Sequence, residues 1–559
     1  MIVPIQHVDV ICPLAEKEAT LSALRDLKAV HLDLASGVSP EVQALRGEAS
    51  HALTAVSLIR RARQEVAIED GAQLREASVQ DVLSWDAEIS ALKDRLVTLA
   101  GLIQKYAPYG DFDPELVKKI RAAGVDLSKV AELPEVLPPQ RLSVLQAEKA
   151  TAEARKAELT AQIAQTDSKP ILTAFPELED RIAFAEARRL MSAHGELAVI
   201  SGWIPEPRVT ALRDAAKVSG WGLLLRAPTD DELPPTLLEP PKAFKPLVAI
   251  FKALGISPAY NEADVSVPFM CYFSLFFAML VGDGAYGLIF LALTLLGWKK
   301  TAGHRSPVAK SWLVLMTVFS SATVLWGLLS NTWFGAGLPC CKDWVTVQWL
   351  ADPSYRHMML LCFTIGVSHL MIARIWNGLC LINDTKFLAE FGWAGILLYM
   401  YFVTNTIVGI FPGVPMPLHI VMGISVLLVA CFSLKKSELK TRGAELGMLP
   451  LTIISSLGDI ISYVRLFAVG LASVKVAENF NSMALSFMAG DHAWYVTALA
   501  AVGMVLVLLV GHGMNIAMAA LSVLVHAVRL NTLEFSNHKG VSWSGYFYSP
   551  FQKRAENNS

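Results

Sequence analysis

The chain has 559 residues, of which 53% are hydrophobic and only 18% are charged, and its mean hydropathy is +0.43. Soluble globular proteins carry about 25% charged residues, so part of this chain must lie in a lipid bilayer. The 48 Lys and Arg residues are balanced by 50 Asp and Glu residues, which leaves a formal charge of −2 and no global basic field of the kind that nucleic-acid binding requires.

The N-terminal half has the composition of a cytosolic domain. Its first residues lack a basic segment followed by a long apolar core, so we expect neither a signal peptide nor an anchor there. Charged residues are common up to about Lys252, and prolines in the stretch 226–246 prevent a continuous helix and indicate a stiff linker. We therefore expect a cytosolic domain over residues 1–245 and a membrane domain over residues 246–559.

Heptad spacing predicts long helices inside the cytosolic domain. The clearest seam consists of Val82, Trp85, Ile89, Leu92, Leu96, Leu99, Ile103 and Tyr106. A weaker seam runs over 142–163, and a third runs over 42–59. Because Pro108, Gly110 and Pro114 break the chain after the first seam, an antiparallel coiled-coil arm is the simplest arrangement, and an ordinary helical bundle is the alternative.

The arm is flanked by two segments with a strand pattern, 7–13 and 197–205, which predict one small α/β head built from both ends of the arm. The cytosolic half has no Gly-rich phosphate loop, nucleophile elbow or metal-ligand cluster, so we expect no nucleotide, cofactor or metal site in this chain. The seven cysteines include no C-x-x-C pair, although Cys340 and Cys341 share a Trp-rich loop where oxidation is conceivable.

Seven apolar blocks follow, and each except the short fifth readily provides the roughly 20 helical residues that cross a bilayer. They cover 267–298, 310–330, 357–376, 389–411, 417–434, 449–471 and 493–530. Basic clusters follow the first and fifth blocks, and the positive-inside rule places both clusters in the cytosol. The first block must then be a hairpin or a re-entrant pair, broken at residues 282–284. The sequence thus predicts a mainly α protein with about eight spans and both termini inside.

Arg465 lies deep in the sixth apolar block. An arginine at the centre of a membrane helix costs roughly 3 kcal/mol on insertion scales, so it is usually functional and faces protein or water. The residues on its side of the helix are mostly small: Gly458, Ile461, Ser462, Ala468, Val469, Ala472 and Val476. Such a face can approach a separate moving surface closely. The alternative is a structural arginine paired with an acid such as Asp459.

The last block carries a polar stripe on one helical face. The stripe consists of Gly511, Asn515, Ser522, His526 and Arg529, with His512 to one side. Titratable groups along one face are what a water-filled half-channel requires, and the alternative is hydrogen bonding between helices. The block would be about 57 Å long as one helix, so it must tilt or bend. Asp283 is a further intramembrane acid, for which a turn role and a functional role are both open.

At these motifs the chain resembles the membrane stator subunit of rotary V-type and A-type ATPases, called subunit I in bacteria and archaea and subunit a in eukaryotes. The matching segments run in order over nearly the whole chain: 28–32, 201–205, 234–239, 276–287, 462–468, 511–515 and 525–535. The Ser-Tyr-Val-Arg-Leu element at 462–466 and the His-Ala-Val-Arg-Leu element at 526–530 are the most specific. Two departures are Asp264-Val265-Ser266 in place of Asp-Pro-Thr, and Ser473 where eukaryotic members have a histidine.

The resemblance implies that Arg465 and Arg529 face the carboxylates of a rotor ring of proteolipid subunits. It assigns ion translocation also to Asp459, Ser462, His512, Asn515, Ser522, His526, Glu534 and Asp283, and a rotor-facing surface to Gly458, Ala468 and Ala472. One half-channel would open to each side of the membrane. Transport of protons or sodium would be coupled to ATP hydrolysis or synthesis, and this chain would be a non-catalytic subunit.

The resemblance also implies partners and a location. The N-terminal domain would bind peripheral-stalk subunits, and the complex would include central-stalk and ATP-hydrolysing subunits, in a prokaryotic plasma membrane. The main rival is a self-contained secondary transporter, which predicts internal repeats, and no convincing repeat relates the first and last four spans. A membrane receptor with a signalling arm is the second rival, but it would not need a charged stripe in its last helices.

Overall fold

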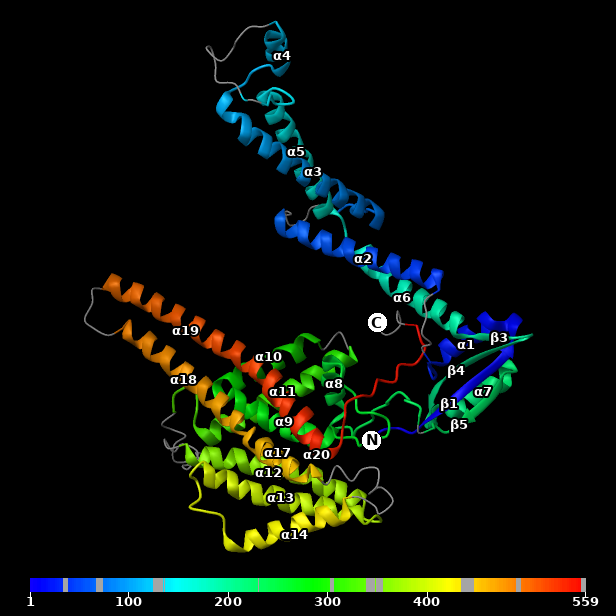
Figure 1. Ribbon diagram of the computed structural model, residues 1–559, viewed down its shortest axis with the longest axis vertical. Helices are drawn as coiled ribbons and strands as arrows, with labels where there is room; N and C mark the ends of the chain where they lie inside the picture. The colour runs from blue at the N-terminus through cyan, green and yellow to red at the C-terminus, as the bar shows by residue number, and fades with distance from the viewer. Residues whose placement is uncertain are drawn as a thin grey trace. The chain divides into compact units, whose positions relative to one another are not determined.

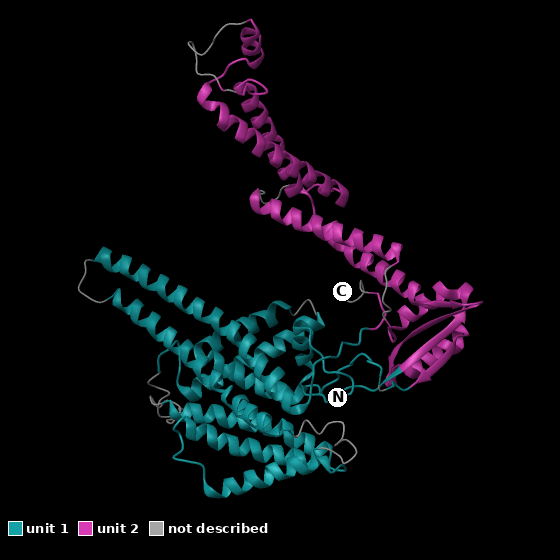
Figure 2. Ribbon diagram, in the orientation of Figure 1, with its two compact units in different colours: residues 1–6, 227–549 teal, residues 7–226, 550–559 magenta. Residues whose placement is uncertain are grey.

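The computed structural model describes residues 1–33, 39–66, 74–123, 134, 136–229, 231–301, 306–337, 347, 355–433, 447–488 and 494–553. Cys340, Cys341 and the second basic cluster lie outside these ranges. The chain divides into two compact units, shown in Figure 2: an arm unit, residues 7–226 with 550–559, and an apolar unit, residues 1–6 with 227–549. The predicted linker is thus grouped with the apolar unit, where Thr236 is buried and its hydroxyl donates to the carbonyl of Pro258 at 2.8 Å.

The arm unit contains a mixed α/β head at the segments where the sequence predicts strands. The strands lie in the order β2-β4-β1-β5, β3 pairs with β4, and His7 of β1 stands opposite Arg226 of antiparallel β5. Helices α1 and α7 supply buried leucines such as Leu24 and Leu212 to the same core as the strands. The bounds are β1 Ile5–Pro13, α1 Lys17–Leu27, β2 His31–Leu32, β3 Ser192–His194, β4 Leu197–Pro205, α7 Val209–Ser219 and β5 Gly222–Arg226.

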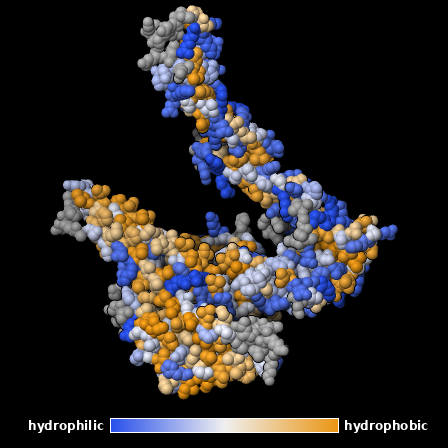
Figure 3. Space-filling view, viewed as in Figure 1, coloured by the Kyte–Doolittle hydropathy of each residue, from blue (hydrophilic) through white to orange (hydrophobic). Residues whose placement is uncertain are grey.

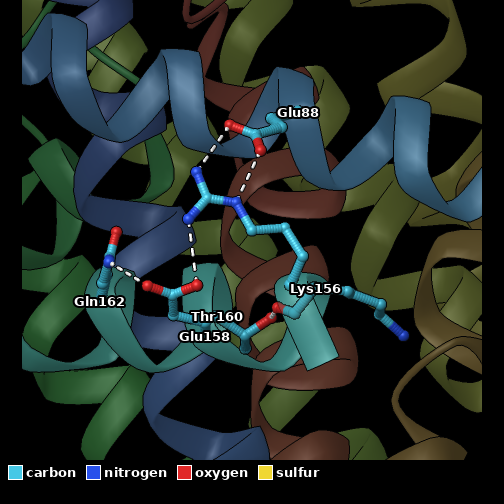
Figure 4. Close-up of polar contacts among 6 residues, drawn as sticks. Glu88, Lys156, Glu158, Thr160 and Gln162 are labelled. Carbon is cyan, nitrogen blue, oxygen red and sulfur yellow. Dashed lines mark hydrogen bonds and ion pairs between the residues drawn. The ribbon is translucent and has the colours of Figure 1, made fainter. Parts of the chain in front are cut away.

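Long helices form the rest of the arm unit: α2 (Pro40–Glu65), α3 (Val79–Tyr106), α4 (Pro114–Ala122), α5 (Leu142–Gln165) and α6 (Lys169–Leu190). Helices α3 and α5 run antiparallel, because Arg95 of α3 pairs with Glu148 while Glu88, earlier in α3, pairs with Arg155, later in α5. In Figure 4, Glu88 and Glu158 lie on either side of the guanidinium group that joins them. The seam positions of α3 are all buried or half-buried. A supercoiled arm remains a prediction.

The apolar unit is a helical domain, and its helices carry much of the apolar surface in Figure 3. Among the residues that the structure describes, five helices are long and apolar enough to cross a membrane, α14 is a shorter apolar helix, and α9 and α10 form a bent pair. The predicted break is confirmed: α9 and α10 meet at 120° around Gly282 and Asp283. The number of spans remains a prediction. The first bounds are α8 Val248–Leu254, α9 Ser266–Val281, α10 Gly284–Thr301, α11 Pro307–Ser330, α12 Arg356–Cys380, α13 Lys386–Ile407 and α14 Met416–Phe432.

The last two apolar segments are longer than the sequence blocks suggest, at 38 residues for Leu449–Ser486 and 46 residues for Trp494–Lys539. They are irregular inside. The first is interrupted at Ser462 and Tyr463, and the second contains two π-helical segments, η7 and η8. Helices α18 and α19 lie side by side and extend beyond the other helices of this unit (Figure 1). The bounds are α17 Leu449–Ile461, α18 Val464–Ser486, α19 Trp494–Ser522, η7 Val523–Ala527, η8 Leu530–Phe535 and α20 Ser536–Lys539.

Candidate functional site

Arg465 follows directly after the interruption between α17 and α18. The amides of Tyr463, Arg465 and Leu466 donate to carbonyls only three residues back, at 3.2, 3.3 and 3.0 Å, which is the tighter 3₁₀ pattern. The side chain of Arg465 is half-buried, and within the part of the chain that the structure describes it makes no hydrogen bond or ion pair. The alternative pairing with Asp459 is not seen, so no direct contact within the described ranges compensates the positive charge.

The face beside Arg465 is open. Gly458, Ala468 and Ala472 are all exposed, and a Cβ atom built on Gly458 would meet nothing within 4 Å. The opposite side of α18 is packed tightly, since a Cβ on Gly470 would come within 2.5 Å of the carbonyl of Met279. The small residues that the sequence placed near Arg465 therefore lie on a surface that no described part of the chain covers.

Arg529 lies in the last helix between the two π-helical segments. Its Nε atom is 3.5 Å from Oε1 of Glu534, and the side chains are 52% and 5% exposed, so the pair joins a surface cation to a buried acid. Arg465 and Arg529 both act electrostatically on His526 and Glu534. The two arginines on separate helices thus share one group of neighbours. We call Arg465, Arg529, His526 and Glu534 the arginine cluster.

The arginine cluster contains buried polar atoms with unused hydrogen-bonding capacity. Among the described residues, neither Nδ1 of His526 nor Oε2 of Glu534 has a hydrogen-bond partner. Buried polar groups are usually satisfied by protein or by ordered water, and leaving one unpaired is costly. The arrangement is suited to water or to a group from another molecule, because a dry, closed interior would leave these atoms unsatisfied.

Asp459 belongs to a separate chain of charges. Nε2 of His538 lies 3.0 Å from Oδ2 of Asp459, Arg374 donates to Nδ1 of His538 at 3.1 Å, and Arg374 also pairs with Glu390 at 3.2 Å. An arginine is always a donor, so Nδ1 of His538 accepts and its Nε2–H points to Asp459. This fixes one tautomer of a neutral imidazole, and it links helices α13, α12, α20 and α17.

A second polar network lies on the other side of Arg465 along α18. Asn515 is fully buried and donates both to the hydroxyl of Tyr286, at 3.0 Å, and to the carbonyl of Ser473, at 2.9 Å. The hydroxyl of Tyr286 also lies 2.7 Å from Nδ1 of His512, whose Nε2 lies 3.2 Å from Oδ1 of Asn481. Every member is hydrogen-bonded to another, so the network connects α10, α18 and α19. We call Tyr286, Ser473, Asn481, His512 and Asn515 the outer network.

The predicted stripe on the last helix is therefore divided. Gly511 and Asn515 are buried toward α18, and a Cβ on Gly511 would come within 2.3 Å of the Phe480 ring. Ser522 and His526 are half-buried, whereas Arg529 is exposed. Helical positions spaced for a regular α-helix drift where π turns intervene, because a π turn bonds residue i to residue i+5. Ser462 keeps to its own helix, with its hydroxyl donating to the carbonyl of Gly458 at 3.0 Å.

Asp283 caps α10 and anchors the segment after α11. Its Oδ1 accepts from the amide of Ala285 at 2.8 Å, and its Oδ2 accepts from the amide of Gly335 at 2.8 Å. The side chain is 1% exposed. These contacts fit the turn role, and they place Asp283 beside Tyr286 of the outer network.

Several polar residues near the site were missed by the sequence reasoning. They are Tyr286, His369, Arg374, Glu390, Tyr463, Asn481 and His538. One signal was available, because His369 and Arg374 are ionisable residues inside an apolar block, which is itself an indication of function or of a buried partner. Within the described residues, no group of three or more His, Cys, Asp or Glu side chains could hold a metal ion.

No family model matches the chain. Three sequence relatives, however, all carry the description subunit I of a V-type or A-type ATP synthase. V-type ATP synthase subunit I of Borreliella burgdorferi is 31% identical over 374 residues, which cover 64% of this chain and 60% of that protein, less than two thirds of its length. V-type ATP synthase subunit I 1 of Treponema pallidum is 27% identical over 99% of this chain and 100% of that protein. A-type ATP synthase subunit I of Methanocaldococcus jannaschii is 25% identical over 79% of this chain and 67% of that protein. The chain is thus a homologue of the subunit I proteins of V-type and A-type ATP synthases, in agreement with the motifs at Arg465 and Arg529.

Proposed function

We propose that this chain is the membrane stator subunit of a V/A-type rotary ATPase and that the open face around Arg465 lies against the rotor ring. The single observation that carries the proposal is the state of Arg465: a cation in an apolar helix, on an exposed surface of small residues, without an ion-pair partner in the described chain. A charge in a membrane helix normally faces protein or water and finds a partner. The missing anion is then supplied by another subunit.

A carboxylate on the ring is the partner that fits this site. Gly458, Ala468 and Ala472 leave room for a second helix to approach closely. When a ring carboxylate passes, the nearby arginine charge favours its ionised form and releases its proton or sodium ion. Once the carboxylate is neutralised again, it can move into lipid. Because Arg465 and Arg529 repel cations, they also prevent a direct leak across the membrane.

The two polar networks would provide the two ion paths. The Asp459–His538–Arg374 chain lies before Arg465 along the helix, toward the expected cytosolic side, about 9 Å away by helical rise. The outer network, with His512 and Asn481, lies toward the opposite end of α18. The arginine cluster separates them, with unsatisfied atoms on His526 and Glu534 that water or an ion can use.

The arm unit would transmit force rather than carry ions. Its antiparallel helices α3 and α5 are joined by ion pairs, and its surface is rich in charge. We propose that it binds the peripheral-stalk subunits of the complex and resists the torque that the turning ring exerts. The ATP chemistry would belong to soluble subunits of the same complex.

The test is ATP-driven ion uptake into inverted membrane vesicles that carry the parent chain or Arg465→Gln, read with a pH dye and repeated with labelled sodium. The matched control is Arg356→Gln, an arginine of the same unit that donates to the carbonyl of Gly409 at 2.6 Å. With equal assembly of the complex, we expect uptake to be lost in Arg465→Gln and kept in Arg356→Gln. Unchanged uptake in Arg465→Gln would remove the basis of the proposal, and uptake that needs an ion gradient but no ATP would favour a secondary transporter.

A further inference from the structure

His369 of α12 is a fully buried imidazole clamped between two aromatic rings. Its ring stacks on Tyr272 of α9, with centroids 3.9 Å apart and planes at 23°, and on Phe535 of η8, with centroids 4.4 Å apart and planes at 12°. Its Nδ1 atom is hydrogen-bonded to the hydroxyl of Tyr463 at 2.9 Å, and both side chains are 0% exposed. The imidazole therefore touches three other segments of the apolar unit at once.

Two of these contacts are neighbours of the arginine cluster. Tyr463 is two residues before Arg465 and lies in the tightened turn between α17 and α18. Phe535 directly follows Glu534 and ends the π-helical segment η8. Both segments depart from regular α-helix, and a local departure persists only where the surrounding structure fixes it. The same imidazole contacts both of them.

The rest of the pocket is shaped for this arrangement. Gly366, one turn before His369 on α12, lies against the Tyr463 ring, and a Cβ atom there would come within 2.6 Å of the Cγ atom of Tyr463. The Tyr463 hydroxyl and His369 are sealed from solvent, so a lost hydrogen bond would leave a buried polar group unpaired. The Tyr463–His369 hydrogen bond is thus both buried and sterically confined.

We propose that His369 is a positioning residue that holds the Arg465 turn and the Arg529–Glu534 segment at a fixed separation. Stacking fixes Phe535, and the hydrogen bond fixes Tyr463, so the distance between the two arginines depends on one imidazole. This inference rests on the proposed function, because it concerns the same pair of arginines. It assigns a role to a histidine that touches neither the ions nor the ring.

Two substitutions remove the hydrogen bond and keep an aromatic ring in place: Tyr463→Phe removes only the hydroxyl, and His369→Phe removes both ring nitrogens. The matched control is Tyr399→Phe, which removes another tyrosine–histidine bond, from Tyr399 to Nδ1 of His419 at 3.1 Å between α13 and α14. In inverted vesicles, the number of ions moved per ATP hydrolysed is measured per assembled complex. Amide hydrogen exchange of residues 460–467 and 530–537 is measured in the purified complex.

We expect each single variant to lower the ratio of ions to ATP about five-fold, and the double variant to be no worse than either single one, since the two groups act as one unit. Exchange should become faster in both segments. The control Tyr399→Phe should change neither the ratio of ions to ATP nor the exchange of the two segments. An unchanged ratio with unchanged exchange in Tyr463→Phe and His369→Phe would overturn the inference, as would effects that simply add or an equal effect in the control.

The failure of this inference can be told apart from the failure of the proposed function. If Arg465→Gln in the same membranes transports ions normally, the stator proposal fails, whatever His369 does. If Arg465→Gln abolishes transport while Tyr463→Phe and His369→Phe behave as the parent, only the positioning role fails. A variant that lowers assembly is still decided by the exchange of the two segments in the complexes that do assemble.

Discussion

Two regions along the last two apolar segments, Leu449–Ser486 and Trp494–Lys539, differ in how their polar side chains are bonded. In the outer network, Asn515, Tyr286 and His512 bond to one another within a closed group. In the arginine cluster, His526 and Glu534 keep buried atoms without a hydrogen-bond partner in the described chain, and Arg465 has no counter-ion there. The closed outer network holds helices together, whereas the unpaired atoms of the arginine cluster are available to water, an ion or a group of another subunit. The outer network would therefore act first as the scaffold beside one proposed ion path, so substitutions there should lower stability more than transport, whereas substitutions in the arginine cluster should lower transport more than stability.

The largest effect is expected where bulk is added to the open face. Ala472→Trp would place a large ring on the face that we propose lies against the rotor ring, so ATP-driven transport should fall at least about 100-fold without loss of stability, because the side chain points away from the fold. Gly423→Trp on α14 is the control, since Gly423 is also exposed with open space around it. Transport in vesicles and thermal unfolding of the purified complex would be compared. Normal transport in Ala472→Trp would mean that this face meets only lipid.

Removing the buried acid of the cluster should have the next largest effect. Glu534→Gln keeps the shape but removes the charge that lies 3.5 Å from Arg529, so the guanidinium loses its partner and is free to hold a ring carboxylate too long. We expect transport to fall about ten-fold, with the complex fully assembled. The measurement is the initial rate of uptake, with Glu478→Gln, an exposed acid paired with Lys475, as control. Equal rates in the two variants would contradict a special role for Glu534.

In the outer network the expected loss is stability. Asn515→Ala leaves the hydroxyl of Tyr286 and the carbonyl of Ser473 without a bond that each now receives. An unpaired buried group costs about 1–3 kcal/mol, so the midpoint of thermal unfolding of the purified chain should fall by several degrees. Asn481→Ala, at the half-buried edge of the network, should cost less. If Asn515→Ala melted like the parent but transported no ions, the contrast between the two regions would be wrong.

The smallest effect concerns the arm unit. A hydrogen bond from the Arg141 guanidinium lowers the pKa of the Asp113 carboxyl; Asp113 caps the N-terminus of α4, and Arg141 directly precedes α5. A lowered pKa in the folded state means that the pair stabilises above the ordinary aspartate pKa, and that this contribution is lost as the pH falls through the lowered value. Arg141→Ala should therefore slightly weaken hydrogen-exchange protection of residues 113–122 at pH 7.

The same comparison at acidic pH tests whether the effect of Arg141 depends on the charge of Asp113. Below the lowered pKa of Asp113, protection factors of Arg141→Ala and the parent should agree, because the protonated carboxyl no longer gains from the guanidinium. A difference that persisted or grew in acid would show that Arg141 acts through packing instead. The Arg141 side chain is exposed and the Asp113 side chain is partly exposed, so solvent weakens the pair and the expected change is small.

Sequence patterns predicted the helices and the break in the first block because these depend on local signals. Apolar blocks of span length, the Gly-Asp-Gly break and the heptad positions of α3 are all visible in a short window of sequence. The small residues around Arg465 were found in the same way: Gly458, Ala468 and Ala472 are exposed, and their contact with a rotor stays a prediction. Local periodicity gives the side of a helix, provided the helix is regular.

The partners of polar residues could not be predicted, because they come from distant segments. Asp459 seemed available to Arg465 six residues away, yet it pairs with His538, which follows the last long helix. The π turns before and after Arg529 shift the polar stripe, and no local residue pattern indicated them. His369 appeared as one polar residue in an apolar block, and only its neighbours Tyr463 and Phe535 give it a role.

The most direct test of the stator role is to identify what covers the face beside Arg465. A photo-reactive p-benzoyl-phenylalanine is placed at Ala472, or at Gly423 as control, in the full complex in native membranes. If the stator role is right, the probe at Ala472 cross-links to a small, carboxylate-bearing membrane subunit, many copies of that subunit react once ATP drives rotation, and the probe at Gly423 does not reach it. Cross-links from Ala472 only to lipid or to this chain itself would contradict the stator role.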